Sequence, residues 1–237
     1  MTITLITGAN RGLGFETARR LVEAGHTVYL GARDAQRGRE ASERIGARTV
    51  EIDVTSDQSV QAAAQHVRDE AGVLDVLVNN AAIVEGRTSS GDWPTVGDVT
   101  AADLERVYAT NVFGLVRVTH AFLPLLRASS HPVVVNVSSS GGSLTRTSDP
   151  DNLASQFTLL AYPSSKSAVN MITVQYANAF ADIKFNAVCP GFTATGLNDN
   201  QGTQTVEEGA EIIVRMATVG SDGPSGGFFE ADGPVPW

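Results

Sequence analysis

Hydrophobic and polar positions follow two patterns that alternate along the whole chain. Short apolar runs rich in β-branched residues, such as Val133-Val134-Val135, are bounded by glycine or polar residues and predict buried strands. Between them lie longer segments whose apolar residues return every three to four positions, as in a helix with one buried face. Strands without polar alternation are typical of a parallel sheet covered on both faces. We therefore predict an α/β fold with three layers, doubly wound around a seven-stranded parallel sheet.

The predicted elements account for most of the chain. The strands are expected at Thr2–Thr7, Thr27–Gly31, Arg48–Asp53, Val73–Asn79, Val133–Ser138, Lys184–Cys189 and, more weakly patterned, Gly227–Glu230. The helices are expected near Gly12–Glu23, Ala35–Ile45, Ser56–Glu70, Ala101–Arg127, Ala161–Ala181 and Val206–Thr218. Irregular segments follow three strands, at Val84–Thr100, Ser140–Leu160 and Gly191–Thr205. Because open α/β sheets bind ligands at the carboxyl ends of their strands, we expect these segments to frame a substrate opening.

A glycine-rich turn follows the first predicted strand. It reads Gly8-Ala9-Asn10-Arg11-Gly12-Leu13-Gly14, and a helical pattern starts within it. A strand, turn and helix of this kind bring backbone N–H groups and a helix N-terminus to one point, which suits a pyrophosphate. The spacing Gly-x-x-x-Gly-x-Gly differs from the common dinucleotide fingerprint Gly-x-Gly-x-x-Gly. Helix packing alone does not require three glycines, so the turn favours a nucleotide site.

Tyr162 and Lys166 lie four residues apart in the second half of the chain. On a helix this spacing places a phenol and an ammonium on one face. Pro163 implies that the helix begins close to Ala161, because proline is tolerated in a first turn and not in a helix interior. A neighbouring cation favours the phenolate, so we expect the pKa of Tyr162 to fall from about 10 toward neutrality. The pair would then exchange protons at cellular pH.

Seven motifs, in this order and spacing, resemble the short-chain dehydrogenase/reductase family over nearly the whole chain. They are Thr7-Gly8-x-x-x-Gly12-x-Gly14, Asp53-Val54, Asn79-Asn80-Ala81-Ala82, Asn111, Asn136-Val137-Ser138-Ser139, Tyr162-x-x-x-Lys166 and Pro190-Gly191-x-x-x-Thr195. Asn10-Arg11, Ala32-Arg33-Asp34 and the tail ending in Trp237 look most like the carbonyl-reductase branch. The resemblance implies one Rossmann-fold domain over residues 1–237, with a nucleotide-binding half at about 1–130 and a catalytic half at about 131–237.

The resemblance implies an enzyme that reversibly reduces an aldehyde or ketone to an alcohol, with four catalytic residues. Tyr162 is the expected proton donor in reduction, while Lys166 lowers its pKa and holds the nicotinamide ribose. Ser139, the second serine of its motif, is expected to bind the substrate oxygen. Asn111 is expected to anchor a water molecule that connects Lys166 to solvent. The residue itself also allows a plainer interpretation, a buried amide bonded to the backbone.

The resemblance also places cofactor contacts after several strands. The expected cofactor-binding residues are Gly8, Asn10, Arg11, Gly12, Leu13, Gly14, Arg33, Asp53, Val54, Asn80, Ala81, Tyr162, Lys166, Pro190, Gly191 and Thr195. Asp53 would contact the adenine ring, although it could instead cap the following helix. Pro190-Gly191 would lie against the nicotinamide ring, and Thr195 would bind its carboxamide. Ala82 stands where the family usually has glycine.

The choice between NAD and NADP depends on the residues after the second strand. NAD sites place an acid there for the ribose 2′-hydroxyl, whereas NADP sites supply a cation for the 2′-phosphate. The resemblance puts the acidic position on Ala32, followed by Arg33, with Arg11 in the nearby turn. Two guanidinium groups suit a phosphate, so we expect NADP(H). Asp34 is the competing ribose contact, because it follows Gly14 by about twenty residues.

Charge and composition narrow the partners and the compartment. The chain has a formal net charge of −9 and a sequence pI of about 4.9, which argues against nucleic acid and anionic membranes as partners. We expect no apolar run to approach the length of a membrane span and no signal peptide before the first strand, and therefore a cytoplasmic protein. The single cysteine, Cys189, is expected in the core, and the four histidines lack metal-site spacing, so no metal is expected.

The same residues leave two questions open, the function and the oligomeric state. For the function, the alternative is a non-catalytic dinucleotide sensor on the same fold, although such proteins often lack the Tyr-Lys pair. The other question concerns assembly: the family often pairs through helices like those expected at Ala101–Arg127 and Ala161–Ala181, giving a homodimer or homotetramer. The long Ser140–Leu160 segment would prevent this if it covered that surface. The carbonyl or alcohol substrate, a small molecule, cannot be named, because specificity lies in the loops.

Overall fold

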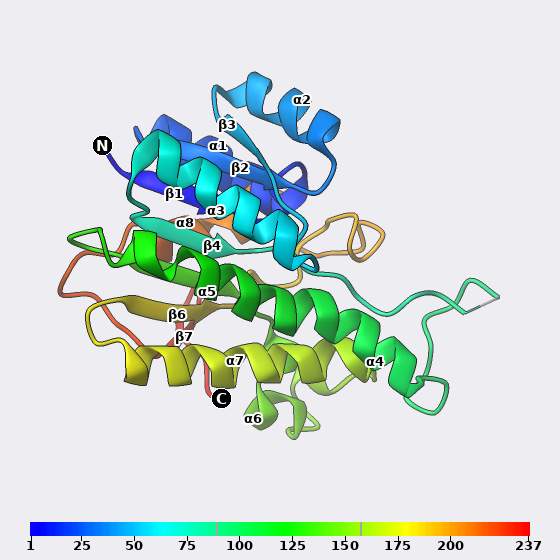
Figure 1. The fold of residues 1–237 in the computed structure, drawn as a ribbon. Coiled ribbons are helices and arrows are strands. Elements are labelled where there is room, and N and C mark those ends of the chain that lie inside the picture. Colours follow the sequence, from blue (N-terminus) through cyan, green and yellow to red (C-terminus); the bar gives the residue numbers. More distant parts are fainter. Residues whose placement is uncertain (89, 157) are drawn as a thin grey trace.

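The computed structural model describes residues 1–88, 90–156 and 158–237, and its strands form one sheet (Figure 1). The strand order is β3-β2-β1-β4-β5-β6-β7-β8. The strands are β1 (Ile3–Ile6), β2 (Thr27–Ala32), β3 (Arg48–Glu51), β4 (Val76–Asn79), β5 (Val133–Val137), β6 (Lys184–Val188), β7 (Phe228–Glu230) and β8 (Gly233–Pro234). The predicted doubly wound α/β fold is confirmed, with one strand more than expected.

The additional strand, β8, lies at one edge of the sheet. It pairs antiparallel with β7, through Phe229 opposite Pro234 and Glu230 opposite Gly233, whereas β1 to β7 pair in parallel. Two residues, one glycine and one proline, carry no hydrophobic period, which explains why the sequence pattern missed this strand. A proline at this position also leaves the edge poorly suited to further pairing.

Helices cover both faces of the sheet (Figure 1). They are α1 (Gly12–Glu23), α2 (Ala35–Ile45), α3 (Asp57–Ala71), α4 (Ala101–Tyr108), α5 (Leu115–Leu126), α6 (Leu144–Thr147), α7 (Ala161–Ala179) and α8 (Val206–Ala217). Neighbouring strand residues point to opposite faces, so Leu5 joins the core beneath α3 and α5, while Ile6 joins the core beneath α1 and α8. Two separate cores therefore fix the sheet between its helix layers.

The helix expected over Ala101–Arg127 is interrupted in the structure. A π-helical turn, η1 (Ala109–Gly114), separates α4 from α5 and carries Asn111. Such wide turns often occur at functional sites, because they re-aim a side chain. By length and composition the helical run Ala101–Leu126 could also span a membrane, contrary to our expectation, and 56% of its most apolar window is buried inside this fold. Apolar core helices meet the same criterion.

The three irregular segments differ from one another. Residues 140–160 contain short helices that their sequence did not predict: η2 (Ser140–Gly142), α6 and η3 (Leu153–Gln156). Gly191–Thr205 is closed by a β-bridge between Thr193 and Gln204. The described part of Val84–Thr100 has no helix or strand and projects from the body of the molecule (Figure 1). All three follow the carboxyl ends of parallel strands, as predicted.

Candidate active site

The glycine-rich turn after β1 is packed tightly against the end of β4. Gly8 has a φ of +64°, and a Cβ atom there would lie 2.9 Å from the Cα of Ala81. A Cβ on Gly14 would lie 2.5 Å from the Asn80 Nδ2, which donates hydrogen bonds to the carbonyl oxygens of Thr7 (2.9 Å) and Gly8 (3.1 Å). Only glycine therefore fits at these two positions without movement of the turn.

The same turn presents unpaired backbone donors. Arg11 precedes α1 without a capping hydrogen bond, and α1 has no acidic residue in its first turn. Among the described residues, the backbone N–H groups of Gly12, Leu13 and Gly14 find no hydrogen-bond acceptor. Unpaired donors at a helix N-terminus attract an anion. The turn, whose Asn10 is half-buried, thus fits the pyrophosphate of a dinucleotide.

Asp34 is occupied at the start of α2. Its Oδ1 accepts hydrogen bonds from the backbone N–H groups of Gln36 and Arg37, both at 3.0 Å. The hydrogen bond from Arg37 is the main reason that the pKa of Asp34 lies below its ordinary value. The carboxylate therefore serves as a helix N-cap and is less available to bind the ribose hydroxyl.

Arg33 and Arg11 are exposed cations near the phosphate turn. Within the described ranges, the Arg33 guanidinium makes no hydrogen bond or ion pair, although its charge acts on Asp53. Arg11 lies toward the segment after β6, because its Nη1 is 3.7 Å from the position of a Cβ on Gly196. Both guanidinium groups are thus free to bind a phosphate.

Asp53 does not cap α3, which removes the plainer interpretation of this residue. Its carboxylate accepts hydrogen bonds from the N–H (2.9 Å) and hydroxyl (2.7 Å) of Thr55, while Ser56 caps α3. Burial would raise the pKa of Asp53, but the bonds from Thr55 and the charge of Arg33 lower it overall. Its neighbour Val54 is buried against the π-helical turn.

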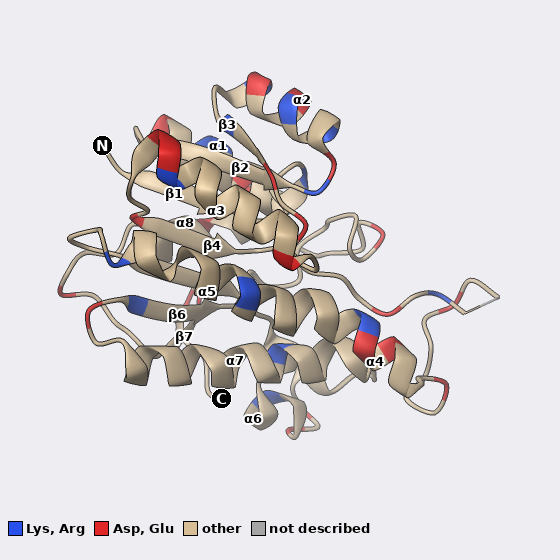
Figure 2. Ribbon diagram, in the orientation of Figure 1, with Lys and Arg blue, Asp and Glu red and all other residues tan. Residues whose placement is uncertain are grey.

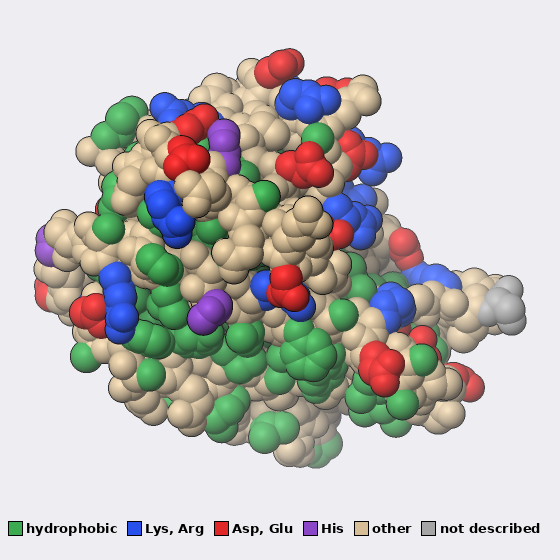
Figure 3. All heavy atoms as spheres, in the orientation of Figure 1, with side chains coloured by type: hydrophobic (Ala, Val, Ile, Leu, Met, Phe, Trp, Pro, Cys, Tyr) green, Lys and Arg blue, Asp and Glu red, His purple; other side chains and the backbone are tan. Residues whose placement is uncertain are grey.

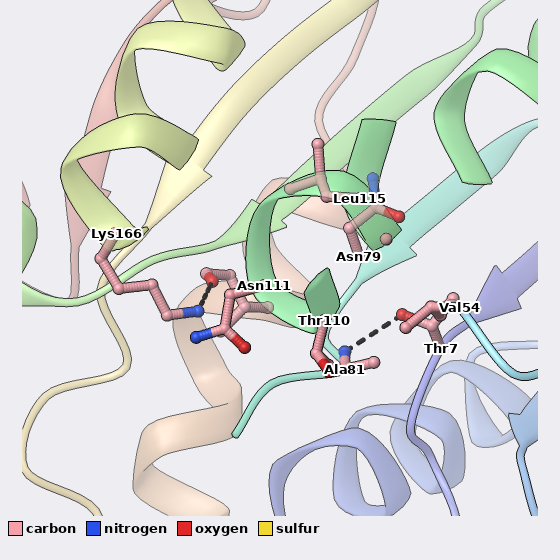
Figure 4. Close-up of a pocket in the computed structure, with 10 residues that line it drawn as sticks. Thr7, Val54, Asn79, Ala81, Thr110, Asn111, Leu115 and Lys166 are labelled. Atoms are coloured by element: carbon pink, nitrogen blue, oxygen red, sulfur yellow. Dashed lines mark hydrogen bonds between the residues drawn. The ribbon is translucent and has the colours of Figure 1, made fainter. Parts of the chain in front are cut away.

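Tyr162, Lys166 and Ser139 meet beside the end of β5. Helix α7 begins at Ala161, as Pro163 indicated. The Nζ of Lys166 lies 5.5 Å from the centroid of the Tyr162 ring and donates a 2.7 Å hydrogen bond to the carbonyl oxygen of Val137 (Figure 4). The Ser139 hydroxyl hydrogen-bonds with the phenol and by itself lowers the phenol's pKa.

The predicted pKa of Tyr162 is wrong in direction. Removal of the phenol from water raises its pKa to about 12, despite the hydrogen bond with Ser139. The nearby Cys189 and Glu85 raise it further. Lys166 does not reverse this, because burial lowers its own pKa to about 8 and its ammonium turns to the Val137 carbonyl. Spacing alone missed the cost of burying both groups.

The choice of Ser139 over Ser138 agrees with the geometry. Ser138 is 2% exposed, and its hydroxyl donates a 2.6 Å hydrogen bond to the Asn170 side chain. Ser139 is half-buried and its Oγ accepts only a long bond of 3.3 Å, from the N–H of Gly141, besides its contact with Tyr162. Ser138 is thus a core residue, whereas the Ser139 hydroxyl faces the phenol.

Asn111 is bonded to backbone, which is the plainer of the two interpretations. Its side chain exchanges two 2.9 Å hydrogen bonds with the backbone of Ile83 and donates a third, of 3.0 Å, to the Ser165 hydroxyl. Asn111 and Lys166 also line a small cavity of about 10 Å³ (Figure 4). A cavity of this size admits about one water molecule. The water-anchoring role stays a prediction.

The residues after β6 lie between the phosphate turn and the catalytic groups. Pro190 is buried, and Gly191 has a φ of +78°, which favours glycine, and lies beneath the side chain of Gln204, which would have to move to admit a Cβ. The side chain of Thr195 lies 3.8 Å from the position of a Cβ on Gly12, so it is beside the phosphate turn. The backbone at Ala82 is outside the left-handed region, so alanine replaces glycine there without strain.

Comparison with known proteins decides the family. A family model described as short chain dehydrogenase matches residues 2–206. This chain belongs to the short-chain dehydrogenase/reductase family.

The relatives of this dehydrogenase/reductase act on varied compounds. It is 38% identical over 232 residues to the short-chain dehydrogenase anuI of Penicillium roqueforti, covering 92% of this chain and 89% of the relative. It is 33% identical over 279 residues to (+)-neomenthol dehydrogenase of Arabidopsis thaliana, covering 95% and 94%. The structure of NADPH-bound carbonyl reductase from chicken fatty liver matches with a TM-score of 0.85, 26% identity and full coverage of both chains. The chain is therefore an oxidoreductase of ketones and alcohols that uses a nicotinamide dinucleotide.

Glu85 of this dehydrogenase/reductase is a site residue that its sequence did not predict. The residue is 3% exposed, and its Oε1 accepts a 2.9 Å hydrogen bond from the backbone N–H of Tyr162. Its only sequence signal is an acid directly after the apolar pair Ile83-Val84, in a segment without periodicity.

In the part of the chain that the structure describes, no group of three histidine, cysteine or acidic side chains is arranged to hold a metal.

Two irregular segments also meet across the opening. Arg87, from the segment after β4, forms an ion pair with Asp199, from the segment after β6. The Arg87 guanidinium lies 3.7 Å from the centroid of the Trp93 ring, which is close enough for a cation–π interaction. Asp199 and Asn200 have positive φ angles of 55° and 61°, so this contact is reached through a strained turn. The two segments therefore lie side by side at the edge of the site.

Proposed function

We propose that this enzyme transfers hydride between NADP(H) and an aldehyde or ketone, with Tyr162 as the proton donor in reduction. The convergence of the Tyr162 phenol, the Ser139 hydroxyl and the Lys166 ammonium supports the proposal most strongly. These groups lie at the carboxyl ends of β5 and β6, at the same sheet edge as the phosphate turn. Bound NADPH would supply the hydride there, and the protein's own groups would hold the carbonyl and provide the proton.

Each catalytic group has a separate task. Ser139 donates a hydrogen bond to the carbonyl oxygen and stabilises the negative charge that develops on it. Tyr162, whose pKa is raised to about 12 so that the phenol stays protonated well above neutral pH, delivers its proton to the same oxygen. Lys166, with a pKa lowered to about 8, can lose and regain a proton near neutral pH and return one to the phenol. Asn111 keeps this side of α7 joined to the segment after β4.

The NADP preference is supported by the cations near the phosphate turn. Arg33 is exposed and without a partner among the described residues, whereas Asp34 is bonded to the start of α2. A carbonyl reductase with the same fold binds NADPH. A 2′-phosphate would therefore meet Arg33, and a ribose hydroxyl would find no free acid in Asp34.

A panel of aldehydes, ketones and quinones tests the proposal directly. The purified protein is incubated with NADPH or NADH and each compound, and oxidation of the nicotinamide is followed by absorbance. We expect turnover with at least one ketone class and faster turnover with NADPH. NADPH binding without turnover on any compound would instead favour the dinucleotide-sensing function.

A self-association surface is part of this proposal. Phe113 of η1, Val116 of α5 and Met171 of α7 are 56%, 37% and 58% exposed. Hydrophobic side chains gather over α5 and α7 (Figure 3), and these helices carry few charges (Figure 2). Apolar patches of this kind often mark interfaces. We propose that two copies of the chain pair through α4–α5 and α7. Light scattering would test this by comparing the molar mass of the wild-type protein with that of Phe113→Glu.

A further inference from the structure

Glu85 stands out as a buried carboxylate that the catalytic scheme does not use. It lies six residues beyond the end of β4, in the segment expected to frame the substrate opening. It is 3% exposed, and its Oε1 accepts the 2.9 Å hydrogen bond from the N–H of Tyr162. This bond joins two segments that are 77 residues apart in the chain.

The hydrogen bond satisfies a donor that α7 would otherwise leave unpaired. Leu160, which precedes α7, makes no capping hydrogen bond with its side chain. The first N–H groups of a helix have no partner within the helix, and a negative charge near them is favourable. Glu85 thus replaces the missing cap from a distant part of the chain. The donor that it holds belongs to Tyr162 itself, so the bond fixes the backbone of the proposed proton donor.

The second carboxylate oxygen of Glu85 lacks a hydrogen bond of this kind. Oε2 is buried and, among the described residues, has no hydrogen-bond partner. Arg106 of α4 lies near, with its Nη2 3.6 Å from the position of a Cβ on Gly86, but it donates to the Val84 carbonyl. Burying an unpaired carboxylate oxygen is unfavourable, and a glutamine would accept the same hydrogen bond at lower cost. The charge is therefore the feature that needs an explanation.

We propose that Glu85 is a positioning residue that fixes Tyr162 at the site and holds it in the role of proton donor. This inference rests on the proposed function, since it assigns Tyr162 to proton transfer. Four groups act on the phenol: Lys166 from the next turn of α7 and Ser139 from the end of β5 lie against it, while Cys189 from the end of β6 and Glu85, bonded to the Tyr162 backbone, act on it through their charge. Glu85 is the acidic one, and its charge disfavours loss of the phenolic proton.

The charge has a predictable effect on the pH dependence. Reduction requires the neutral phenol and oxidation requires the phenolate. With Glu85 in place, reduction should continue to higher pH, and oxidation should begin at higher pH, than with a neutral residue. Glu85→Gln keeps the acceptor for the Tyr162 N–H and removes the charge. Glu85→Ala removes both.

The two substitutions separate positioning from charge. For Glu85→Ala we expect kcat for reduction to fall about ten-fold or more, because a displaced phenol no longer meets the carbonyl oxygen. For Glu85→Gln we expect kcat at low pH to stay within about three-fold of wild type, since the hydrogen bond remains. Its pH profile should nevertheless move to lower pH by about half a unit or more. Glu105→Gln, an exposed acid on α4, is the matched control and should leave the profile unchanged.

A titration that needs no activity completes the test. The protein contains four tyrosines, and with ¹³C-labelled Cζ atoms their phenols can be followed separately by NMR. The signal missing in Tyr162→Phe belongs to Tyr162. We expect ionisation of that phenol to start at lower pH in Glu85→Gln than in wild type and Glu105→Gln.

The outcomes are distinguishable. An unchanged Tyr162 titration in Glu85→Gln overturns the electrostatic part, and wild-type kcat in Glu85→Ala overturns the positioning part. If the wild-type protein reduces no carbonyl but the titration moves as expected, the proposed function fails while the effect of Glu85 on Tyr162 stands.

Discussion

The two ends of the site are built in different ways. The cofactor end consists mainly of backbone: glycines at Gly8 and Gly14 that leave no room for a Cβ, and unpaired N–H groups at the start of α1. The catalytic end consists of side chains packed together, with Lys166 buried and Tyr162 and Ser139 half-buried, and removal from water shifts the pKa values of both Tyr162 and Lys166. Backbone geometry follows from local sequence, whereas the chemistry of buried side chains depends on distant segments.

The first prediction compares two adjacent serines at the catalytic end. Ser139→Ala should lower kcat for carbonyl reduction by about 100-fold or more, because it removes a donor to the developing oxyanion. NADPH affinity should change little. Ser138→Ala should instead lower stability by about 1 kcal/mol, since it breaks the buried bond to Asn170 and leaves catalysis largely intact. Steady-state kinetics and urea unfolding of both variants check this. Equal loss of kcat in the two variants would contradict the assignment of Ser139.

The second prediction addresses the cofactor end. Arg33→Ala should raise the KM for NADPH by about one to two decades, because it removes a charge-assisted hydrogen bond to the 2′-phosphate. The KM for NADH should stay nearly unchanged. Ala32→Asp should move the preference toward NADH by repelling the 2′-phosphate. Arg39→Ala, an exposed cation on α2, is the control. Tighter binding of NADH than NADPH by the unaltered protein would mean that Arg33 is a surface charge only.

The third prediction uses pH to test the burial of Lys166. Its pKa is lowered from 10.5 to about 8 in the folded protein, so between these values the unfolded chain binds more protons and stability should rise with pH. The pKa of Tyr162 is raised from 10.0 to about 12, so between those values stability should fall. In urea unfolding, the free energy of unfolding of Lys166→Met should exceed that of wild type most at neutral pH, and this difference should shrink above pH 8. A difference independent of pH would show that Lys166 is not desolvated.

The smallest expected effect is a change in hydrogen exchange. NADPH should slow exchange in Gly191–Thr205, because Pro190-Gly191 and Thr195 are expected to contact it, while the core strand β5 should be unaffected. Amide exchange with and without NADPH measures this. Equal protection of Gly191–Thr205 in both states would count against a role in closing the site.

The cofactor end was the more predictable from sequence. Gly12–Glu23 and Ala35–Ile45 form helices with the predicted bounds, because the helical period and the residues that bound each helix, a glycine-rich turn for the first and the N-cap Asp34 for the second, are local signals. The catalytic residues were placed by resemblance, and the structure brings Tyr162, Lys166 and Ser139 together. The π-helical turn at Ala109–Gly114 carried no local signal that we recognised, and its Gly114 packs closely against Val54 from a distant segment.

The environment of the catalytic side chains was not predictable. The Tyr162 pKa is raised mainly by removal of the phenol from water, and further by Cys189 and Glu85, which come from two other segments. Glu85 itself lies where no period or motif marks it, and its partner is 77 residues away. The sequence thus indicates which groups are present, and only the packed structure shows how far they are removed from water.

The most direct test of the account is a single turnover with Tyr162→Phe. The variant and the wild-type protein are each saturated with NADPH deuterated at the transferable position and mixed with a ketone found in the panel, and deuterium in the alcohol product is followed in time. We predict that both proteins bind NADPH equally and that label transfer in the variant is slower by about 100-fold or more. Label transfer in Tyr162→Phe at more than about a tenth of the wild-type rate would contradict the assignment of Tyr162 as the proton donor.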